Sequence, residues 1–270
     1  MFVFALLLLS LPLDSLRPLG PTPVVSFHSA AAWQEAATSA NVWKGREEEF
    51  ENCLKTAKVL KVEDVPIGVT KPKRAFVEPG GVCQSFAWKV LPPGIHKGFW
   101  DSYKSEIAAY ELDKLVGLGM VPPIVEREVD RQRGAAVLWL NGVHSWEEAL
   151  RKPKAPSWTR NVVRMKMWDN FVGNSDRNKG NILVDASGEL FLIDHSRAFT
   201  SEKKLPSKLE SYADRDLWER LQALTFEQLK ERIGQWVGNG EIRAMLARRD
   251  RMKKDIDAMV AVRGDHAYVK

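Results

Sequence analysis

The chain has 270 residues, of which 44% are hydrophobic and 28% are charged. These fractions are near the averages of soluble globular proteins, which excludes collagen-like, low-complexity and wholly disordered chains and leaves one or two domains with a packed core. The net charge of +5 mildly favours anionic ligands. The basic residues are scattered among acids, so we expect no nucleic-acid binding.

The first 40 residues differ in composition from the rest. Met1–Leu13 is an apolar stretch too short to span a bilayer, and a Pro-, Ser- and Ala-rich stretch follows it. We therefore expect no integral membrane domain. A signal peptide, a misassigned start and a buried N-terminal helix all fit the apolar stretch. Export would place the protein in the periplasm or outside the cell, and otherwise it is expected in the cytoplasm.

The cysteine content is low. Cys53 and Cys83 fit either a disulfide in an oxidising compartment or two buried thiols, and the sequence does not decide between these states. The chain has no C-x-x-C pair, no H-E-x-x-H motif and five histidines, so we do not expect a zinc site.

The segment 41–142 is rich in strand patterns, with a single long helix inserted. Residues 102–116 have helical spacing and end at Gly117, which is typical just past a helix. A Pro-Gly-Gly break indicates a hairpin before that helix. The other elements expected here are a helix at 46–59, strand-like sequence at 62–77, hairpin strands at 75–77 and 82–91, and a buried strand at 135–140.

The segment 143–264 is mostly helical. Ser145 with Glu148 and Thr225 with Gln228 form capping boxes that predict helix starts. Helices are expected at 160–171, 217–224, 225–237 and 241–262, and a hairpin at 182–184 and 190–193. The order of elements predicts an α+β fold of two lobes, a strand-rich N-lobe (41–142) and a helical C-lobe (143–264), with a cleft between them.

Lys89 and a glutamate of the following helix are the first candidates for chemistry. Lys89 lies among apolar residues of an expected strand, where its ammonium can bind nucleotide phosphates. Glu106 can pair with Lys89 and hold it extended. Glu111 is a rival from the same helix, and surface pairing is the alternative role for either glutamate.

The second set of candidates surrounds the hairpin of the second half. Asp176 and Asn181 lie five residues apart in the loop before it, and Asp194 follows its second strand. A hairpin brings its ends together, so Asn181 and Asp194 can bind one hard divalent cation while Asp176 faces the same space. A metal bound to phosphate oxygens next to a carboxylate that orients a hydroxyl is what γ-phosphoryl transfer needs. A solvated Asn- and Asp-rich turn is the alternative.

These residues resemble a known group. Ser105 to Gly117 leading into Val121-Pro122-Pro123, and Gly173-Asn174-Ser175-Asp176-Arg177 with Asn181 and Asp194, are similar to the atypical branch of the protein-kinase-like superfamily. That branch includes the phosphoinositide kinases, the HipA-type bacterial kinases and the secretory-pathway kinases related to Golgi casein kinase. The closest resemblance is to bacterial members of the secretory-kinase type.

The resemblance spans about residues 62–200 and implies a two-lobed protein-kinase-like fold. It implies that Asp176 acts on the acceptor, that Asn181 and Asp194 bind metal, and that Lys89 contacts phosphates with Glu106 as its partner. Asn178 stands where many relatives carry His, and His195-Ser196 stands in place of Phe-Gly.

The resemblance does not indicate which segment covers the nucleotide phosphates, because the sequence has no G-x-G-x-x-G loop. Gly68 to Lys73, with the Thr70 hydroxyl, can replace that loop, and a plain basic turn fits the same residues. Residues 137–140 are expected to lead to the hinge that meets adenine.

The function expected from these residues is an ATP-dependent phosphotransferase that uses Mg²⁺ or Mn²⁺ and phosphorylates a hydroxyl of a protein, sugar or lipid. A kinase-fold AMP transferase and a non-catalytic nucleotide-binding or partner-binding module are the alternatives. Intact Asp176 and Asp194 argue against the non-catalytic module, because degenerate members of such families usually lose one or both.

Overall fold

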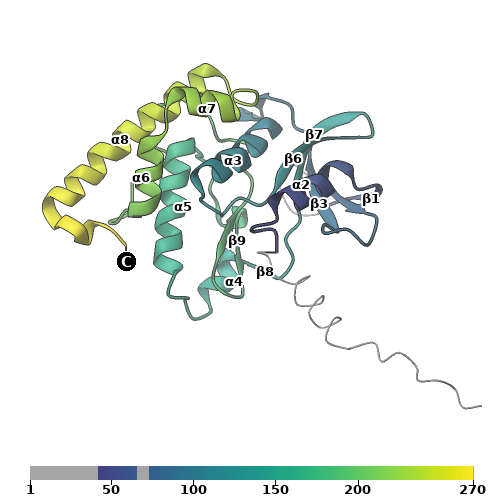
Figure 1. The fold of residues 1–270 in the computed structure, drawn as a ribbon, viewed down its shortest axis with the longest axis horizontal. Helices are drawn as coiled ribbons and strands as arrows, with labels where there is room; N and C mark the ends of the chain where they lie inside the picture. Colours follow the sequence, from purple (N-terminus) through teal and green to yellow (C-terminus); the bar gives the residue numbers. More distant parts are fainter. Residues whose placement is uncertain (1–41, 66–72, 270) are drawn as a thin grey trace, which may run out of the picture.

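The computed structural model describes residues 42–65 and 73–269. Strands and two helices from the first half of the chain lie beside a mainly helical part from the second half (Figure 1). This arrangement confirms the predicted α+β class. Among the described residues, no helix is both long enough and apolar enough to cross a bilayer. The segment 1–40 lies outside the described residues.

A five-stranded antiparallel sheet forms the centre of the first half. Its strands follow the spatial order β1-β2-β3-β7-β6. Their bounds are β1 Val59–Asp64, β2 Lys73–Val77, β3 Ser85–Lys89, β6 Ile124–Val129 and β7 Gln132–Leu138. The hairpin expected around the Pro-Gly-Gly break is the β2–β3 pair, which registers Lys73 opposite Trp88.

The two faces of this sheet pack against different helices. Phe86 and Trp88 of β3 belong to the apolar cluster that contains Phe50 and Leu54 of α2 (Glu47–Thr56). Ala87 points to the other face, toward the cluster formed with α3 (Tyr103–Val116). Because side chains alternate along a strand, Lys89 lies on the same face as Ala87. The strand lysine therefore faces α3.

A disulfide between Cys53 and Cys83 joins α2 to the turn that precedes β3. Both cysteines belong to the apolar cluster on the α2 face. The bond links residues 30 positions apart in the sequence. The structure thus shows the disulfide that the sequence left open.

Helix α3 begins and ends where its sequence predicts. The Ser102 side chain accepts a hydrogen bond from the Lys104 N–H, and Gly117 ends the helix in the left-handed region with φ 60°. Glycine adopts this conformation without the steric cost that a Cβ brings. These caps fix the position of Glu106 along the helix axis.

Three strand pairings were not expected from the sequence. Strand β6 pairs with β7 over its whole length. In the sequence, a short hairpin of β4 (Gly94–His96) and β5 (Phe99–Asp101) lies between β3 and α3. Strand β8 (Val143–Ser145) adds to the small sheet of the second half. The three-residue strands β4, β5 and β8 carry too little alternation to be recognised by pattern alone.

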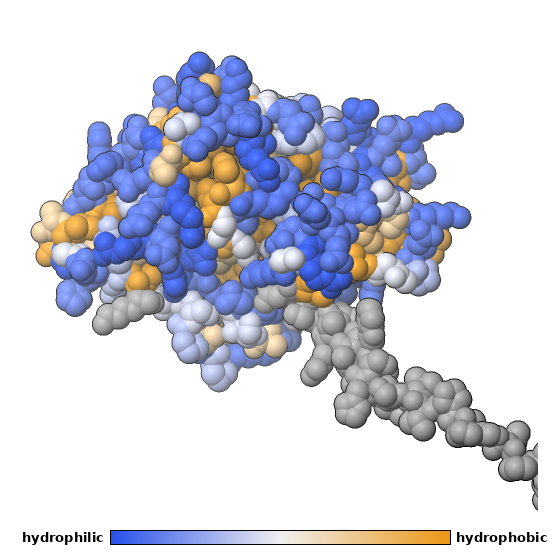
Figure 2. All heavy atoms as spheres, in the orientation of Figure 1, coloured by the Kyte–Doolittle hydropathy of each residue, from blue (hydrophilic) through white to orange (hydrophobic). Residues whose placement is uncertain are grey.

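The second half contains the remaining helices and a three-stranded sheet of order β10-β9-β8. Its elements are α4 Trp146–Leu150, α5 Trp158–Val172, η1 Lys179–Asn181, β9 Ile182–Asp185, β10 Leu190–Leu192, α6 Arg215–Ala223, α7 Phe226–Ile233, α8 Asn239–Arg263 and η2 Gly264–Ala267. Both expected capping boxes are present. Figure 2 shows one face of the molecule as mainly hydrophilic, with hydrophobic atoms visible near its middle.

Several expected boundaries were wrong, including those of the strands at 82–91 and 135–140, which are β3 (Ser85–Lys89) and β7 (Gln132–Leu138). Helix α2 ends at Thr56 and β1 begins at Val59, so the helix expected to reach residue 59 is shorter. The strand-like stretch 62–77 contains the end of β1 and the whole of β2, and its residues 66–72 lie outside the described residues. Helix α7 ends at Ile233 with Gly234 as its C-cap, although Trp236 and Val237 continue the apolar spacing toward residue 237.

Candidate active site

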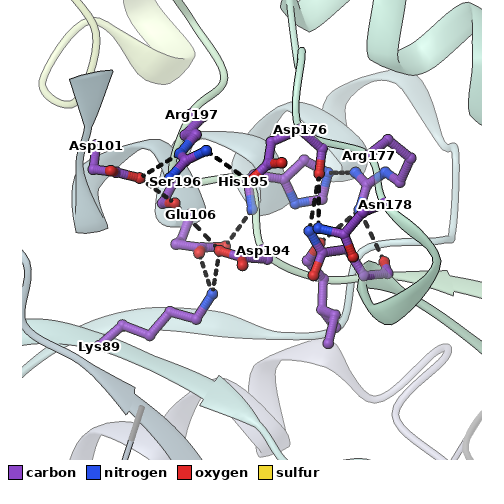
Figure 3. Close-up of polar contacts among 12 residues, drawn as sticks. Lys89, Asp101, Glu106, Asp176, Arg177, Asn178, Asp194, His195, Ser196 and Arg197 are labelled. Atoms are coloured by element: carbon purple, nitrogen blue, oxygen red, sulfur yellow. Dashed lines mark hydrogen bonds and ion pairs between the residues drawn. The ribbon is translucent and has the colours of Figure 1, made fainter. Parts of the chain in front are cut away.

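Lys89, Glu106 and Asp194 come from three separate segments and meet at one point. The Lys89 Nζ atom donates to Glu106 Oε1 at 2.5 Å and to Asp194 Oδ1 at 2.8 Å (Figure 3). The sheet alternation and the caps of α3 bring the first two together, and the end of β10 supplies the third. The Lys89 ammonium therefore lies between two carboxylates.

The charges of this cluster hold one another in place. Burial opposes the charge on Lys89, but the carboxylates of Glu106 and Asp194 outweigh it and raise the pKa of the ammonium. The Lys89 charge in turn keeps the pKa of Asp194 well below its ordinary value. Both groups are thus ionised at neutral pH.

Glu106 is fully buried and has a second contact. Its Oε2 atom accepts the backbone N–H of His195 at 2.9 Å. Burial raises the pKa of Glu106 in spite of the nearby Lys89. The other glutamate of the helix, Glu111, pairs with Lys114 at 3.0 Å and Arg232 at 2.8 Å. Of the two glutamates, Glu106 is the one that contacts Lys89.

Asp194 has a left-handed backbone, with φ 59°. This conformation is uncommon for a residue other than glycine, and such residues concentrate at functional sites. The Ser196 hydroxyl lies 3.2 Å from Asp194 Oδ1. The turn after β10 thus points the Asp194 side chain back toward Lys89.

The loop that contains Asp176 and Asn181 is fixed by its own amide groups. The Asn181 side chain donates to the Asp176 carbonyl at 3.0 Å. The Ile193 N–H donates to the Asn181 carbonyl at 3.1 Å. Asn181 is therefore next to the residue that precedes Asp194, as expected for the two ends of a hairpin. The Asp176 carboxylate is 37% exposed and pairs with Arg197 at 3.2 Å.

Arg177 joins this loop to the segment before Asp194. Its guanidinium binds both carboxylate oxygens of Asp169 at 3.0 Å, and it donates to the carbonyls of Asn181 at 2.9 Å and Ile193 at 2.6 Å. A planar guanidinium suits such multiple contacts. Arg177 lies within the motif that carries the resemblance, but the sequence alone indicates no role for it.

His195 is a second residue that received no role from the sequence. It is fully buried, and its Nε2 atom accepts from Trp168 Nε1 at 3.1 Å and lies 2.8 Å from Arg177 Nη2. Since both neighbours are donors, Nε2 acts as the acceptor and the proton lies on Nδ1. Burial lowers the pKa of His195 well below its ordinary value. His195 is a neutral support for the loop.

Two glycines allow the close packing around the site. A Cβ on Gly134 of β7 would come within 2.4 Å of the Lys89 carbonyl oxygen. Gly173 begins the loop before Asp176 with φ 72°, and a Cβ there would come within 2.6 Å of the Arg248 guanidinium carbon. Gly68 and Thr70, expected near the phosphates, lie outside the described residues.

The strand expected to lead to the hinge continues the sheet. The Trp139 N–H donates to the Ser85 carbonyl at 3.2 Å, one step beyond the Phe86–Leu138 pair. Residues 137–140 thus follow β3 away from Lys89.

The contacts that include Lys89 and Arg197 form a cluster with excess negative charge. Glu106, Asp194, Asp101 and Asp176 face two cations, Lys89 and Arg197. Among the described residues, no group of three or more His, Cys, Asp or Glu could hold a metal alone. The Asp194 carboxylate and the Asn181 amide oxygen are the kinds of ligand that Mg²⁺ takes together with phosphate oxygens.

Two solved structures share the fold of the chain. The hydra Fam20 structure with sugar aligns with a TM-score of 0.64 and 14% identity, and the alignment covers 91% of this chain and 99% of that one. The Golgi casein kinase with Mn and ADP bound aligns with a TM-score of 0.63 and 13% identity, covering 84% and 79%. At these identities the likeness shows the fold. No curated protein matches the sequence.

A comparison with protein-family models gives a more specific assignment than the fold does. The model of phosphatidylinositol 3- and 4-kinases matches residues 49–212, which is more than half of the sequence and includes β1 to β10. The resemblance inferred from the motifs is thereby confirmed. The chain belongs to the phosphatidylinositol 3- and 4-kinase family and is a kinase-like phosphotransferase with a two-lobed, protein-kinase-like fold.

Proposed function

We propose that the protein transfers the γ-phosphoryl group of ATP to a hydroxyl of a protein, sugar or lipid, with Mg²⁺ or Mn²⁺ as the metal. The contact of Lys89 with both Glu106 and Asp194 carries this proposal, because it joins the sheet, α3 and the segment after β10 at one charged point. The Golgi casein kinase structure, which holds Mn and ADP, supports the choice of nucleotide and metal class.

Each residue has a defined part in this proposal. Lys89 binds nucleotide phosphates while Glu106 holds its ammonium in place, and Asp194 with Asn181 binds the metal. Asp176, whose carboxylate is partly exposed, accepts or orients the proton of the acceptor hydroxyl. A bound divalent cation would neutralise charge on the phosphates. Gly68 and Thr70, which lie outside the described residues, would contact the phosphates.

The proposal does not choose between a protein, a sugar and a lipid as the acceptor. The similar hydra structure contains a sugar, the family name refers to a lipid headgroup, and the other similar structure is named for a protein substrate. The residues described above position a hydroxyl without selecting among these acceptors.

Nucleotide binding tests the metal assignment directly. We expect ATP with Mg²⁺ or Mn²⁺ to raise the melting temperature of the wild type, because a ligand that binds the folded state stabilises it. Asp194→Ala should lose this shift, whereas Asp176→Ala should keep it and lose turnover. Asp257→Ala, an exposed position on α8, is the control. Equal shifts in the wild type and Asp194→Ala would refute the metal site.

The mass of the product distinguishes the two enzymatic alternatives. A gain of one phosphate on the acceptor supports phosphoryl transfer, whereas a gain of AMP indicates transfer of the nucleotide. A wild type that binds ATP but shows neither transfer nor hydrolysis would be a non-catalytic module.

We also propose an oxidising compartment, outside the cytoplasm, for the protein. The Cys53–Cys83 disulfide supports this location, because cytoplasmic thiols are generally kept reduced. We further assign residues 41–142 to the N-lobe and 143–264 to the C-lobe. This division separates the five-stranded sheet and α3 from the helices that follow.

A further inference from the structure

Arg197 contacts two acids at the edge of the candidate active site. Its Nη1 atom lies 3.2 Å from Asp176 Oδ2, and its Nε atom donates to Asp101 Oδ1 at 3.2 Å (Figure 3). Within the described part of the chain, Arg197 is the one cation at ion-pair distance from Asp176. No hydrogen bond of Asp176 Oδ1 occurs there, so this oxygen is available to an acceptor hydroxyl.

The other side of Arg197 is held by the β4–β5 hairpin. Asp101, at the end of β5, is 3% exposed as a side chain and also accepts the Ser196 hydroxyl at 2.9 Å. The Phe99 ring lies under the guanidinium, with its centroid 4.4 Å from the Arg197 Cζ atom. The guanidinium thus has an aromatic ring on its face and a buried carboxylate on its edge.

The β4–β5 hairpin and the loop of Asp176 are far apart in the sequence. Among the described residues, the ion pairs of Arg197 with Asp101 and Asp176 are the ion pairs that connect them. The Ser102 N–H also binds the Ser196 carbonyl at 2.9 Å, which fixes the backbone next to Arg197 against the start of α3. Movement of the hairpin would therefore move the guanidinium relative to Asp176.

We propose that Arg197 is a positioning residue for phosphoryl transfer, and that the β4–β5 hairpin holds it in place. This inference rests on the proposed function, in which Asp176 acts on the acceptor hydroxyl. By binding Oδ2, Arg197 restricts the rotation of the Asp176 carboxylate and leaves Oδ1 directed at the acceptor. Small displacements of a catalytic group can strongly reduce the rate of reaction.

Kinetics with Arg197→Gln tests the proposal. ADP release from Mg-ATP, with water as the acceptor, gives kcat and the KM for ATP without knowledge of the natural acceptor. We expect kcat to fall about 10- to 100-fold while the KM for ATP and the thermal shift with Mg-ATP stay near wild type. Arg197→Lys should recover part of kcat, because lysine keeps the charge but cannot bind both acids in one plane.

Variants of the hairpin test the second half of the proposal. Phe99→Ala should lower kcat less than Arg197→Gln does, and Phe99→Leu should lower it least. In a double-mutant cycle, Arg197→Gln and Asp101→Asn should be non-additive in kcat, because both remove the same contact. Arg215→Gln is a matched control, since Arg215 also combines an ion pair, to Asp265 at 2.6 Å, with a ring contact, to Tyr268 at 4.0 Å.

The outcomes separate this inference from the proposed function. A wild type that neither hydrolyses ATP nor transfers phosphate would overturn both. An active wild type with unchanged kcat in Arg197→Gln would overturn the positioning role alone. Loss of the Mg-ATP thermal shift in Arg197→Gln would also overturn it, because Arg197 would then belong to the nucleotide site. If Arg197→Gln does not fold, the kcat of Arg197→Lys and Phe99→Ala decides in the same way, and unchanged kcat in both would overturn the positioning role.

Discussion

Helices α3 and α8 use charged residues in opposite ways. Glu106 and Asp113 of α3 are both almost completely buried, although α3 has only 14 residues. Helix α8 has 25 residues, and its pair of Lys253 with Asp257 leaves both side chains more than half exposed. Its one buried charge is Arg248. Figure 1 places α3 against the sheet and α8 at the outside of the helical part.

This difference has an energetic meaning. Removing a carboxylate from water costs several kcal/mol unless cations or N–H groups compensate for the lost hydration. An ion pair on the surface loses little hydration and contributes little to the free energy of unfolding. The buried charge of Glu106 is therefore expected to serve the site. The Asp113 carboxylate is expected to hold the turn after α3, and the charges on the surface of α8 to serve solubility. Four predictions test this contrast, beginning with the largest effect.

Loss of the Lys89 charge should be the most damaging change. Lys89→Met leaves Glu106 buried without its cation, which we expect to lower the free energy of unfolding by about 3 to 5 kcal/mol. Turnover of ATP should fall more than about 100-fold, since the phosphates lose their lysine contact. Urea unfolding and ADP release measure the two effects.

A double variant separates stability from function. Lys89→Met with Glu106→Gln removes both charges, so much of the stability should return while turnover stays low. Recovery of turnover in the double variant would show that Lys89 acts only through folding. The buried charge of α3 would then contribute to stability and not to function.

Arg248 is the exception on α8 and should behave like the residues of α3. It donates to the carbonyls of Phe171, Thr200 and Glu202. Arg248→Met keeps an unbranched apolar stem but removes the guanidinium that donates to these carbonyls, which should cost about 2 to 3 kcal/mol. Arg251→Met, at an exposed position of the same helix, is the control. Equal unfolding free energies for the two variants would contradict this expectation.

Asp113 should make stability depend on pH. Burial raises its pKa to about 6, although Gly119, Met120 and Val121 donate N–H groups to it. A raised pKa means that the folded state binds the proton more tightly, so stability is present at low pH and is lost as pH rises through 6. We expect a decrease of about 2 kcal/mol between pH 4 and pH 7.

Urea unfolding at several pH values measures this slope. The pKa of Asp194 is lowered instead, so its contribution is lost only below about pH 4 and does not mask the effect. Asp113→Asn should reduce the dependence between pH 4 and pH 7, and Glu106, whose pKa burial also raises, should account for the dependence that remains. A stability that rises over this range in the wild type would contradict the assignment to Asp113.

Much of the site could be found from the sequence because its residues lie in locally recognisable elements. Strand alternation placed Lys89, helix caps placed α3 and its Glu106, and a hairpin joined the ends that carry Asn181 and Asp194. Their contacts in the structure follow from these elements. Their roles in binding ATP and metal stay predictions.

The supporting residues could not be found in this way because their contacts join distant segments. Arg197 meets Asp101 across 96 positions and Arg248 meets Phe171 across 77. No periodicity encodes such contacts, and the β4–β5 hairpin is too short to show a pattern. A buried arginine in an otherwise charged helix looks like a surface residue until the neighbouring segments are in place.

The smallest effect is expected on the surface of α8. Lys253 lies 2.6 Å from Asp257 one turn later, with side chains 53% and 59% exposed. Lys253→Ala should change the free energy of unfolding by no more than about 0.5 kcal/mol, because solvent screens the pair and a lysine that precedes its acid is the weaker orientation. Urea unfolding in 1 M salt should remove even this difference, while the loss in Lys89→Met should remain, because buried pairs are screened much less. A salt-resistant loss in Lys253→Ala as large as that of Lys89→Met would mean that exposure does not separate the charges of the two helices.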